Sequence, residues 1–312
     1  MMQIGVDFGG TKIEVAALAA DGGFLTRLRE PNPGTYGAAL ATVVRLVEQV
    51  EDQLRRTGTV GLAVPGSMSP TTGRMRNANS TWLNDRPFRE DLAAALRRPV
   101  RLANDANCLA LSETVDGAAA GAAVVFAVII GTGYGGGLAV DGQLITGANG
   151  LTGEWGHIAL PWPAAAEVPG PACWCGLHGC LETWISGTGL QRDHAAVTGQ
   201  TLSAEAIVAA AQTAEVAAVA SLDRYVDRLA RALAMVMNLV DPDVVVLGGG
   251  LSNVSDLYPR LAEQVPRHVF ADSIVTRIVP ARWGDSSGVR GAARLWPVDG
   301  PGSCARGNTD GK

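Results

Sequence analysis

The chain has 312 residues, a formal net charge of −5, an apolar content of 47% and charged residues at 18%. This length allows two domains with separate cores, and the composition is that of an ordinary α/β protein rather than a disordered or fibrous one. Scattered Lys and Arg and the lack of any run of roughly 18–20 apolar residues exclude a nucleic-acid surface and a membrane span.

The predicted elements begin with a pattern that occurs twice. Residues 3–26 read as an apolar strand, a glycine-rich turn with threonine, a second apolar strand and a D-G turn into a third. Residues 126–146 repeat this order. Two such units about a hundred residues apart indicate two structurally related halves.

The other predicted elements follow from hydrophobic periodicity and turn residues. In the first half they are a helix at 37–56, a strand at 59–66, and a strand within 98–107 that continues as a helix to about 120. In the second half they are helices at 183–196, 203–211, 215–240, 255–269 and 286–296, and strands at 241–250 and 274–281. We predict one domain of residues 1–118 completed by about 288–298, a second of 119–287, and a disordered tail at 299–312.

Three glycine-rich turns are candidate nucleotide cradles, because glycine lets backbone N–H groups approach an anion closely. The first matches neither a Walker A loop nor G-x-G-x-x-G, and contains Asp7, Gly9, Gly10, Thr11 and Lys12. The others contain Gly131, Thr132 and Gly133, and, at the end of a buried strand, Gly249 and Gly250. A tight turn explains each one alone, but together they fit a nucleotide held between two domains.

Asp105, in A-N-D-A-N, is the candidate general base. Phosphoryl transfer needs a carboxylate to accept the proton of the acceptor hydroxyl, together with positive groups on the phosphates. A plain helix N-cap is the alternative role at this position, which Asn104 and Asp105 both suit. The amide-rich segment 77–84 can bind sugar hydroxyls or form an ordinary turn.

A cluster of cysteines and a histidine predicts a metal site. Three of the five cysteines lie close together, whereas Cys108 lies in an apolar run and Cys304 near the end of the chain. The N-terminal sequence has no secretion-signal pattern, so a cytoplasmic protein is expected, in which clustered cysteines indicate metal binding before a disulfide. One disulfide plus free thiols is the alternative.

The proposed zinc ligands form a Cys₃His set: His157, Cys173, Cys175 and Cys180. His178, inside the cysteine loop, competes with His157 for the fourth position. We prefer His157 because a ligand from outside the loop ties the loop to its domain. Glu154 and Glu182 lie on either side of this region. Each alone is explained as a solvated surface side chain, but the segment that contains the proposed zinc ligands (the metal loop) would fix both in place.

With these residues assembled, the chain resembles sugar kinases of the ROK family from Gln3 to Trp296, and within that family bacterial fructokinases. The likeness rests on D-F-G-G-T-K, N-A-N-S-T-W-L-N, L-A-N-D-A-N-C, G-T-G-Y-G-G-G, G-E-W-G-H, C-W-C-G-L-H-G-C-L-E-T-W-I-S-G-T-G and D-P-D-V-V-V-L-G-G-G. It implies the actin-like ATPase (ribonuclease H-like) fold, with two related α/β domains around a cleft, the first completed by the C-terminal helix.

The resemblance also implies roles for individual residues. Asp105 deprotonates the sugar hydroxyl, and His157 binds both zinc and sugar. The turns at 7–12 and 131–137 take the phosphates and Mg²⁺, while Gly249 and Gly250 flank the adenosine. The implied sugar-binding residues are Gly66, Asn79, Asn104, Asp105, Glu154, His157 and Glu182. A homodimer is also implied.

The predicted function is ATP-dependent phosphorylation of D-fructose to fructose 6-phosphate. Glucokinase, mannokinase or broad hexokinase activity is the first alternative, because discrimination among hexoses depends on small differences in side-chain placement. A sugar-sensing repressor is a remote alternative, since a DNA-binding segment would be expected ahead of the first strand. A non-kinase ATPase of the actin-like superfamily is disfavoured by the metal loop and Asp105.

Overall fold

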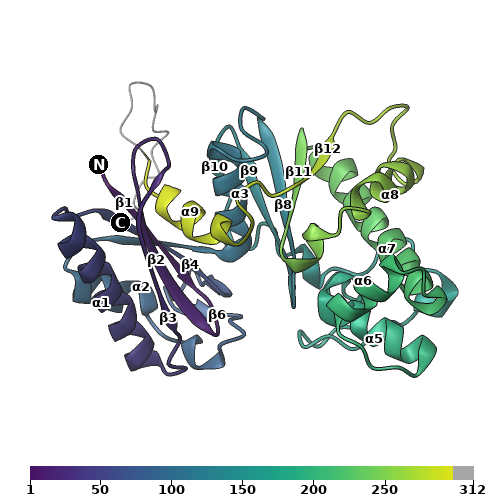
Figure 1. Cartoon of the computed structure of the whole chain (residues 1–312), viewed down its shortest axis with the longest axis horizontal. Coiled ribbons are helices and arrows are strands. Elements are labelled where there is room, and N and C mark those ends of the chain that lie inside the picture. The colour runs from purple at the N-terminus through teal and green to yellow at the C-terminus, as the bar shows by residue number, and fades with distance from the viewer. Residues whose placement is uncertain (298–312) are drawn as a thin grey trace.

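Two five-stranded sheets with the same strand topology form the body of the protein, in a computed structural model that describes residues 1–297 (Figure 1). In order across the sheet, the first contains β3 (Phe24–Pro31), β2 (Lys12–Leu18), β1 (Gln3–Phe8), β4 (Thr59–Val64) and β7 (Val100–Asn104). The second contains β10 (Gln143–Leu144), β9 (Tyr134–Val140), β8 (Val124–Ile130), β11 (Val244–Gly248) and β12 (Arg277–Pro280). In each sheet an antiparallel meander continues into two parallel strands, which confirms the predicted relation between the halves.

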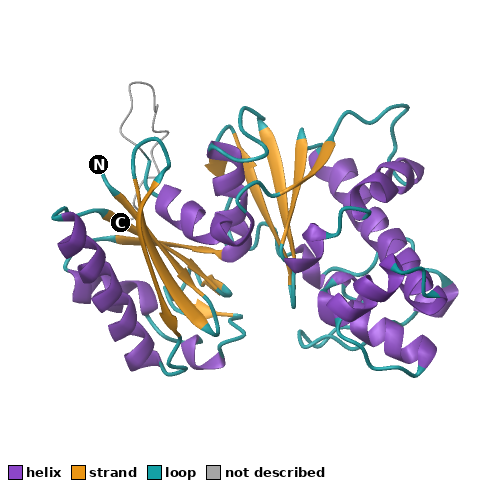
Figure 2. Ribbon diagram, in the orientation of Figure 1, coloured by secondary structure: helices purple, strands orange, loops and turns teal. Residues whose placement is uncertain are grey.

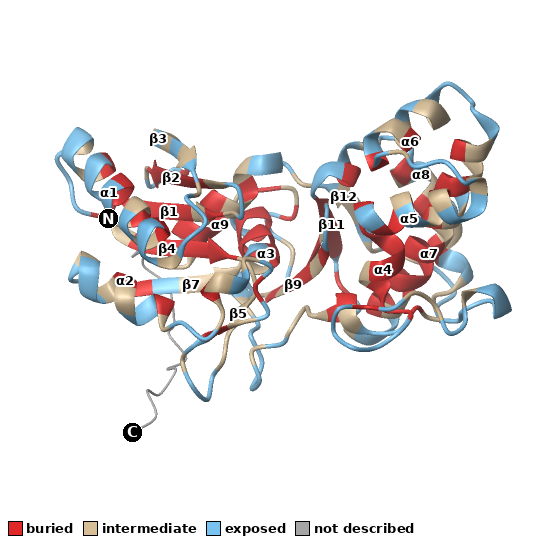
Figure 3. Ribbon diagram, turned by 90° about the horizontal axis from the view of Figure 1, so that it is seen from below, coloured by how far each residue is buried: buried red, intermediate tan, exposed pale blue. Residues whose placement is uncertain are grey.

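Helices cover both faces of each sheet (Figure 2). On the first sheet, α1 (Tyr36–Leu54) and α2 (Phe88–Leu96) pack on one face and α9 (Ser287–Arg294) on the other. On the second, α3 (Asp105–Val115) packs on one face, and the opposite side carries α4 (Leu181–Ile185), α5 (Gly187–Thr198), α6 (Ala204–Gln212), α7 (Val216–Val240) and α8 (Leu257–Gln264). Figure 3 shows buried residues concentrated along the sheets and on α9, α4 and α7.

Several predicted boundaries differ from those observed. The helix expected at 183–196 is two helices, because Ser186 caps the second by accepting from the Gly189 N–H at 3.0 Å. The helix that follows β7 ends at Val115, not near 120. Helix α2 and the short hairpin of β5 (Ser67–Met68) and β6 (Met75–Arg76) were not predicted.

Glycines let α9 approach the first sheet and α3 at backbone distance. A Cβ at Gly5 in β1 or Gly61 in β4 would lie 1.9 or 2.0 Å from a backbone oxygen of α9. A Cβ at Gly291 in α9 would lie 1.8 Å from the backbone oxygen of Cys108 in α3. Because real Cβ atoms do not approach this closely, the C-terminal helix can dock between β1, β4 and α3 only with glycine at these positions.

The predicted domain limits, 1–118 with about 288–298 and then 119–287, stay a proposal. Helix α3, which they assign to the first domain, packs on the second sheet, where Leu109 and Ala110 belong to one buried cluster with Val125 and Val246. Within residues 1–297, no single helix is long and apolar enough to cross a membrane, and α6 and α7 meet the length and composition requirement only as a pair bent by 113°. The predicted disordered tail and Cys304 lie outside the described residues.

Candidate active site at the junction of the two sheets

The turn between β1 and β2 is the first predicted phosphate cradle. The Gly9 N–H donates to the Lys12 oxygen at 3.0 Å, which closes the turn. Asn32, at the end of β3, braces it: its side-chain amide donates to the Gly9 oxygen at 2.7 Å, and its backbone N–H to the Thr11 oxygen at 2.9 Å. Gly10 and Thr11 remain exposed, so the tip of the turn is open to a ligand.

The second and third predicted cradles meet at the ends of β8 and β11. A Cβ at Gly249 would lie 2.6 Å from the Ile130 oxygen, so the two turns are in backbone contact. Thr132, Gly133, Gly249 and Gly250 are exposed. The structure therefore brings these turns together, as a shared nucleotide site requires.

The beginning of α5 joins the same cluster, which the sequence predictions did not assign to the site. The Gly187 N–H donates to the Gly131 oxygen at 2.7 Å, and the Thr188 hydroxyl to the Thr132 oxygen at 3.1 Å. A glycine-rich S-G-T-G at a helix start is a recognisable pattern for anion binding and could have indicated this segment.

Asn104 and Asp105 stand at the junction of β7 and α3. Asn104 is the N-cap of α3, and its side-chain oxygen accepts from the Ala106 N–H at 2.8 Å. The Asn104 amide also donates to the Gly66 oxygen at 3.3 Å, which brings two predicted sugar-binding residues together. Asp105 is the first helical residue and its side chain is exposed, so capping is not its only available role.

Three carboxylates from different parts of the chain, Asp7, Asp105 and Glu154, influence one another near the start of α3. Loss of hydration raises the pKa of Asp105, and the charge of Glu154 adds to this effect, whereas the hydrogen bond from the Ala106 N–H opposes it. Burial raises the pKa of Asp7 to about 6, with a further contribution from the charge of Asp105, opposed by Lys12. Such a concentration of negative charge favours a bound divalent cation, as the Mg²⁺ of a nucleotide complex would provide.

The amide-rich loop lies beside the first cradle. A Cβ at Gly10 would lie 3.7 Å from the Ser80 hydroxyl oxygen, and the Ser80 N–H donates to the Asn79 side chain at 2.7 Å. Asn84 holds the loop closed by accepting from the Ala78 N–H at 2.9 Å. Asn79 itself is exposed at the edge of the site.

Glu182 lies between the metal loop and the second cradle. Its Oε2 atom is 3.4 Å from the Tyr134 backbone nitrogen, which donates to it, and 3.5 Å from the position of a Cβ at Gly133. Its Oε1 accepts from the Trp174 indole N–H at 2.8 Å. The contact with Trp174 was not predicted.

The predicted zinc ligands form one cluster. The ligand atoms of His157, Cys173, Cys175 and Cys180 all lie within 4.8 Å of one another. The Cys173 Sγ is 3.5 Å from the His157 Nδ1, and the Cys175 and Cys180 sulfurs are 3.7 Å apart. Ligands of tetrahedral zinc are separated by roughly 3.5–4 Å, given Zn–S bonds of about 2.3 Å, so the residues fit this metal.

The structure also separates the two candidate histidines. His178 is exposed and lies outside the cluster, whereas His157 lies within it, as preferred from the sequence. All four cysteines of the described residues are free. The structure therefore does not contain the alternative, a disulfide within the cluster.

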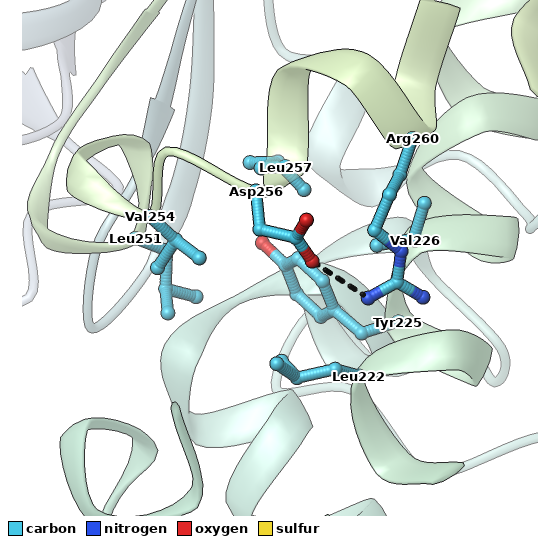
Figure 4. A pocket seen from close by; sticks show the side chains of 8 residues that line it. All are labelled: Leu222, Tyr225, Val226, Leu251, Val254, Asp256, Leu257 and Arg260. Carbon is cyan, nitrogen blue, oxygen red and sulfur yellow. Dashed lines mark ion pairs between the residues drawn. The ribbon is translucent and has the colours of Figure 1, made fainter. Parts of the chain in front are cut away.

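A small recess elsewhere in the second half contains none of the predicted site residues. It lies between α7, the 3₁₀ turn at Gly250–Asn253 and α8, and its lining includes Leu222, Tyr225, Leu251, Leu257 and Arg260 (Figure 4). Arg260 pairs there with Asp256 at 3.6 Å. Its lining is mainly apolar, and Arg260 pairs with its one carboxylate, Asp256, so the recess offers no cluster of carboxylates and amides like that at the start of α3.

The fold and the site together define a two-halved nucleotide-binding α/β protein with the actin-like ATPase fold. The ROK family model matches residues 3–298, and the chain belongs to the ROK family. Two N-acetyl-D-glucosamine kinases, from Pectobacterium atrosepticum and Salmonella typhimurium, are 39% and 40% identical over 303 residues, which are 96% of this chain and 100% of each relative.

Solved structures of ROK proteins share the fold. The ROK hexokinase of Thermus thermophilus has a TM-score of 0.84 at 30% identity, over 94% of this chain and 97% of that one. The ROK glucokinase of Streptomyces griseus, in complex with glucose and AMPPNP, has a TM-score of 0.77 at 26% identity, over 95% and 99%. The predicted likeness to fructokinases in particular is not supported by these relatives.

Proposed function

We propose that the protein is an ATP-dependent sugar kinase whose acceptor is N-acetyl-D-glucosamine. The observation that carries this proposal is 39–40% identity to kinases of that name over their full length. Glucose is the second candidate, because the Streptomyces griseus relative is a glucokinase. These relatives favour another hexose, the predicted alternative, over D-fructose. We therefore do not propose D-fructose as the acceptor.

Asp105 is the proposed general base. Its carboxylate accepts the proton of a sugar hydroxyl while the hydroxyl oxygen forms a bond to the γ-phosphorus, and the bond from that phosphorus to the β–γ bridging oxygen breaks to release ADP. The raised pKa of Asp105 suits this role, because a more basic carboxylate holds the proton better. Asn104 supports this role because it caps α3 and so orients the backbone of Asp105.

The three glycine turns are the proposed nucleotide site. Backbone N–H groups at 7–12 and 131–133 would hold the phosphates, and Gly249 and Gly250 would flank the adenosine. Bound Mg²⁺ neutralises phosphate charge in such sites, and Asp7 is the residue of the first turn suited to holding it. The exposed tips of these turns, and the backbone contact between the second and third, support the assignment.

The sugar site is proposed on the metal-loop side of Asp105. Amides and carboxylates can exchange hydrogen bonds with hydroxyl groups. The proposed residues are Gly66, Asn79, Asn104, Glu154, His157 and Glu182. Zinc held by His157 and the three cysteines would lock the imidazole in one orientation. A homodimer, which the family resemblance implies, stays a prediction.

The test is ADP release measured with N-acetyl-D-glucosamine, glucose, mannose and fructose in turn. We expect the highest kcat/KM with N-acetyl-D-glucosamine and little ATP turnover without sugar. A higher kcat/KM with another hexose would support the sugar-kinase activity but contradict N-acetyl-D-glucosamine as the preferred acceptor. Hydrolysis of ATP that is independent of every sugar would contradict the kinase proposal and favour a non-kinase ATPase.

A further inference from the structure

Trp174 is a large aromatic side chain placed where a loop would ordinarily carry a small or polar one. It lies between Cys173 and Cys175 in the metal loop, and 65% of its surface is exposed. Burial of apolar surface therefore contributes little to its retention at this position. Its position is nevertheless defined by two contacts.

Both contacts of Trp174 are with residues of the proposed sugar site. Its indole Nε1–H donates to Glu182 Oε1 at 2.8 Å. Its ring meets the His157 ring edge to face, with centroids 4.7 Å apart and an interplanar angle of 87°. An indole has one polar donor and an otherwise apolar body, so it can hold a carboxylate and present a flat apolar surface at the same time.

Glu182 is oriented from two sides. Trp174 donates to one carboxylate oxygen, and the Tyr134 N–H approaches the other at 3.4 Å. A carboxylate has about four acceptor positions, so positions remain free for a sugar hydroxyl. The Tyr134 contact alone is long, which leaves the indole as the stronger restraint on the carboxylate plane.

We propose that Trp174 is a positioning residue of the sugar site. Its N–H holds the Glu182 carboxylate in the orientation that accepts a sugar hydroxyl, and its exposed ring forms a side wall against the C–H face of a pyranose. This inference rests on the proposed function, because it assigns Glu182 to a sugar. It also connects the metal loop to Glu182 by a route separate from His157.

The first test is Trp174→Phe, which keeps an aromatic ring and removes the donor. We expect the Kd for N-acetyl-D-glucosamine, measured by calorimetry without nucleotide, and its KM to rise about tenfold, because a hydrogen bond to a charged group is lost. The KM for ATP, the bound zinc and the melting temperature should stay as in the wild type. Trp174→Ala should weaken sugar binding further, since the wall is lost as well.

Trp162→Phe is the matched control. Trp162 is 55% exposed, but its ring stacks on His268, 5.6 Å between centroids, and not on a ring of the proposed sugar site. Sugar affinity should be unchanged in this variant. Equal sugar affinity in Trp174→Phe and the wild type would overturn the proposal.

A second measurement does not depend on turnover. In ¹⁵N-labelled, ligand-free protein, the indole N–H resonance that disappears in Trp174→Phe should shift in Glu182→Ala. An unchanged resonance would show that the contact is absent and would also overturn the proposal. A wild-type protein that binds and phosphorylates none of the four sugars refutes the proposed function instead, whatever the resonance does.

Discussion

We propose different roles for Asn104 and Asp105, which are adjacent at the start of α3. Both are suited to capping a helix, and local sequence alone does not separate them. In the structure Asn104 occupies the N-cap, and the Ala106 N–H lies 2.8 Å from an oxygen of each side chain. Because Asn104 supplies the cap, the Asp105 carboxylate can act on a substrate without loss of the helix terminus.

Asp105→Asn should therefore separate chemistry from structure. We expect kcat to fall by about 10²–10⁴-fold, the usual contribution of a general base. Sugar affinity and melting temperature should stay close to those of the wild type, because Asn104 still caps α3. A variant that kept most of its kcat would show that another group accepts the proton.

Asp7 should make stability depend on pH. Its pKa in the folded protein is raised from 3.8 to about 6, so the stability contributed by its protonated form is present below about pH 4 and is lost as the pH rises through about 6. Asp7→Asn removes the charge. The variant should be more stable than the wild type at pH 7.5, by on the order of 1–2 kcal/mol, and no more stable at pH 4.

Urea unfolding of the ligand-free proteins at both pH values measures this difference. Asp52→Asn, at an exposed position on α1, is the control and should show no gain at either pH. An Asp7→Asn variant whose stability matched that of the wild type at pH 7.5 would mean that Asp7 has no raised pKa.

At the scale of elements, we expect the metal loop to be the segment that depends most on a bound group. Between residues 158 and 180 it contains one 3₁₀ turn, Ala165–Glu167, and two isolated β-bridges, Ala159–Cys180 and Ala172–His178, rather than a long helix or strand. Glu167 ties the middle of the loop to α7 through ion pairs with Arg228 and Arg231. We expect the ligands at 157, 173, 175 and 180 to fix the rest, because a structural zinc contributes directly to folding energy.

Removal of the metal by a chelator, or Cys175→Ser, should lower stability and sugar affinity together. We expect the melting temperature to fall by roughly 5 °C or more, since a loss of about 2 kcal/mol has this effect in a chain of this size. His178→Ala is the control, because His178 is exposed and outside the cluster. Metal loss without any change in stability would refute a structural zinc.

Helix α9 is held against the first sheet by close backbone contact. Gly291→Ala would place a methyl group where only 1.8 Å separates it from the Cys108 oxygen. We expect a loss of about 2–3 kcal/mol in urea unfolding, because backbone on both sides must move. Gly37→Ala in α1, with nothing within 4 Å, should instead stabilise the protein by about 0.5–1 kcal/mol.

At the scale of the whole molecule, Glu113 links the two chain segments that run between the sheets, one after α3 and one before α9. It is fully buried near the end of α3. Its Oε2 accepts from the Ala118 and Arg282 N–H groups at 2.8 and 2.9 Å, and its Oε1 from the Trp283 N–H at 3.2 Å and the Ser287 hydroxyl at 2.9 Å. One carboxylate thus connects the chain leaving α3 with the chain entering α9.

Glu113→Gln should loosen this connection. A glutamine has one acceptor oxygen, and its NH₂ group would face two donors, so about 2–4 kcal/mol of stability should be lost. Urea unfolding measures the loss, and Glu48→Gln, exposed on α1, should change little. A Glu113→Gln variant as stable as the wild type would mean that other contacts hold the two segments between the sheets together.

Much of the molecule was predictable because the information is local. Alternation of apolar residues and glycine turns determines β1, β2, β8 and β9, and the same strand order in both halves follows from the repeated pattern. Cysteine spacing indicated the metal loop, and residues such as Asp7 and Asp105 mark strand ends. Hydrophobic period and turn chemistry are properties of neighbouring residues, so one sequence is enough to read them.

The tertiary structure decided what depends on residues distant in sequence. It placed α3 on the second sheet, brought His157 rather than His178 to the cysteines, brought the start of α5 to one of the predicted nucleotide cradles and joined Trp174 to Glu182. The preference for fructose, which the relatives do not support, has the same origin. Which hexose fits depends on small differences in the positions of side chains from several elements, and those positions follow from packing rather than from residue type.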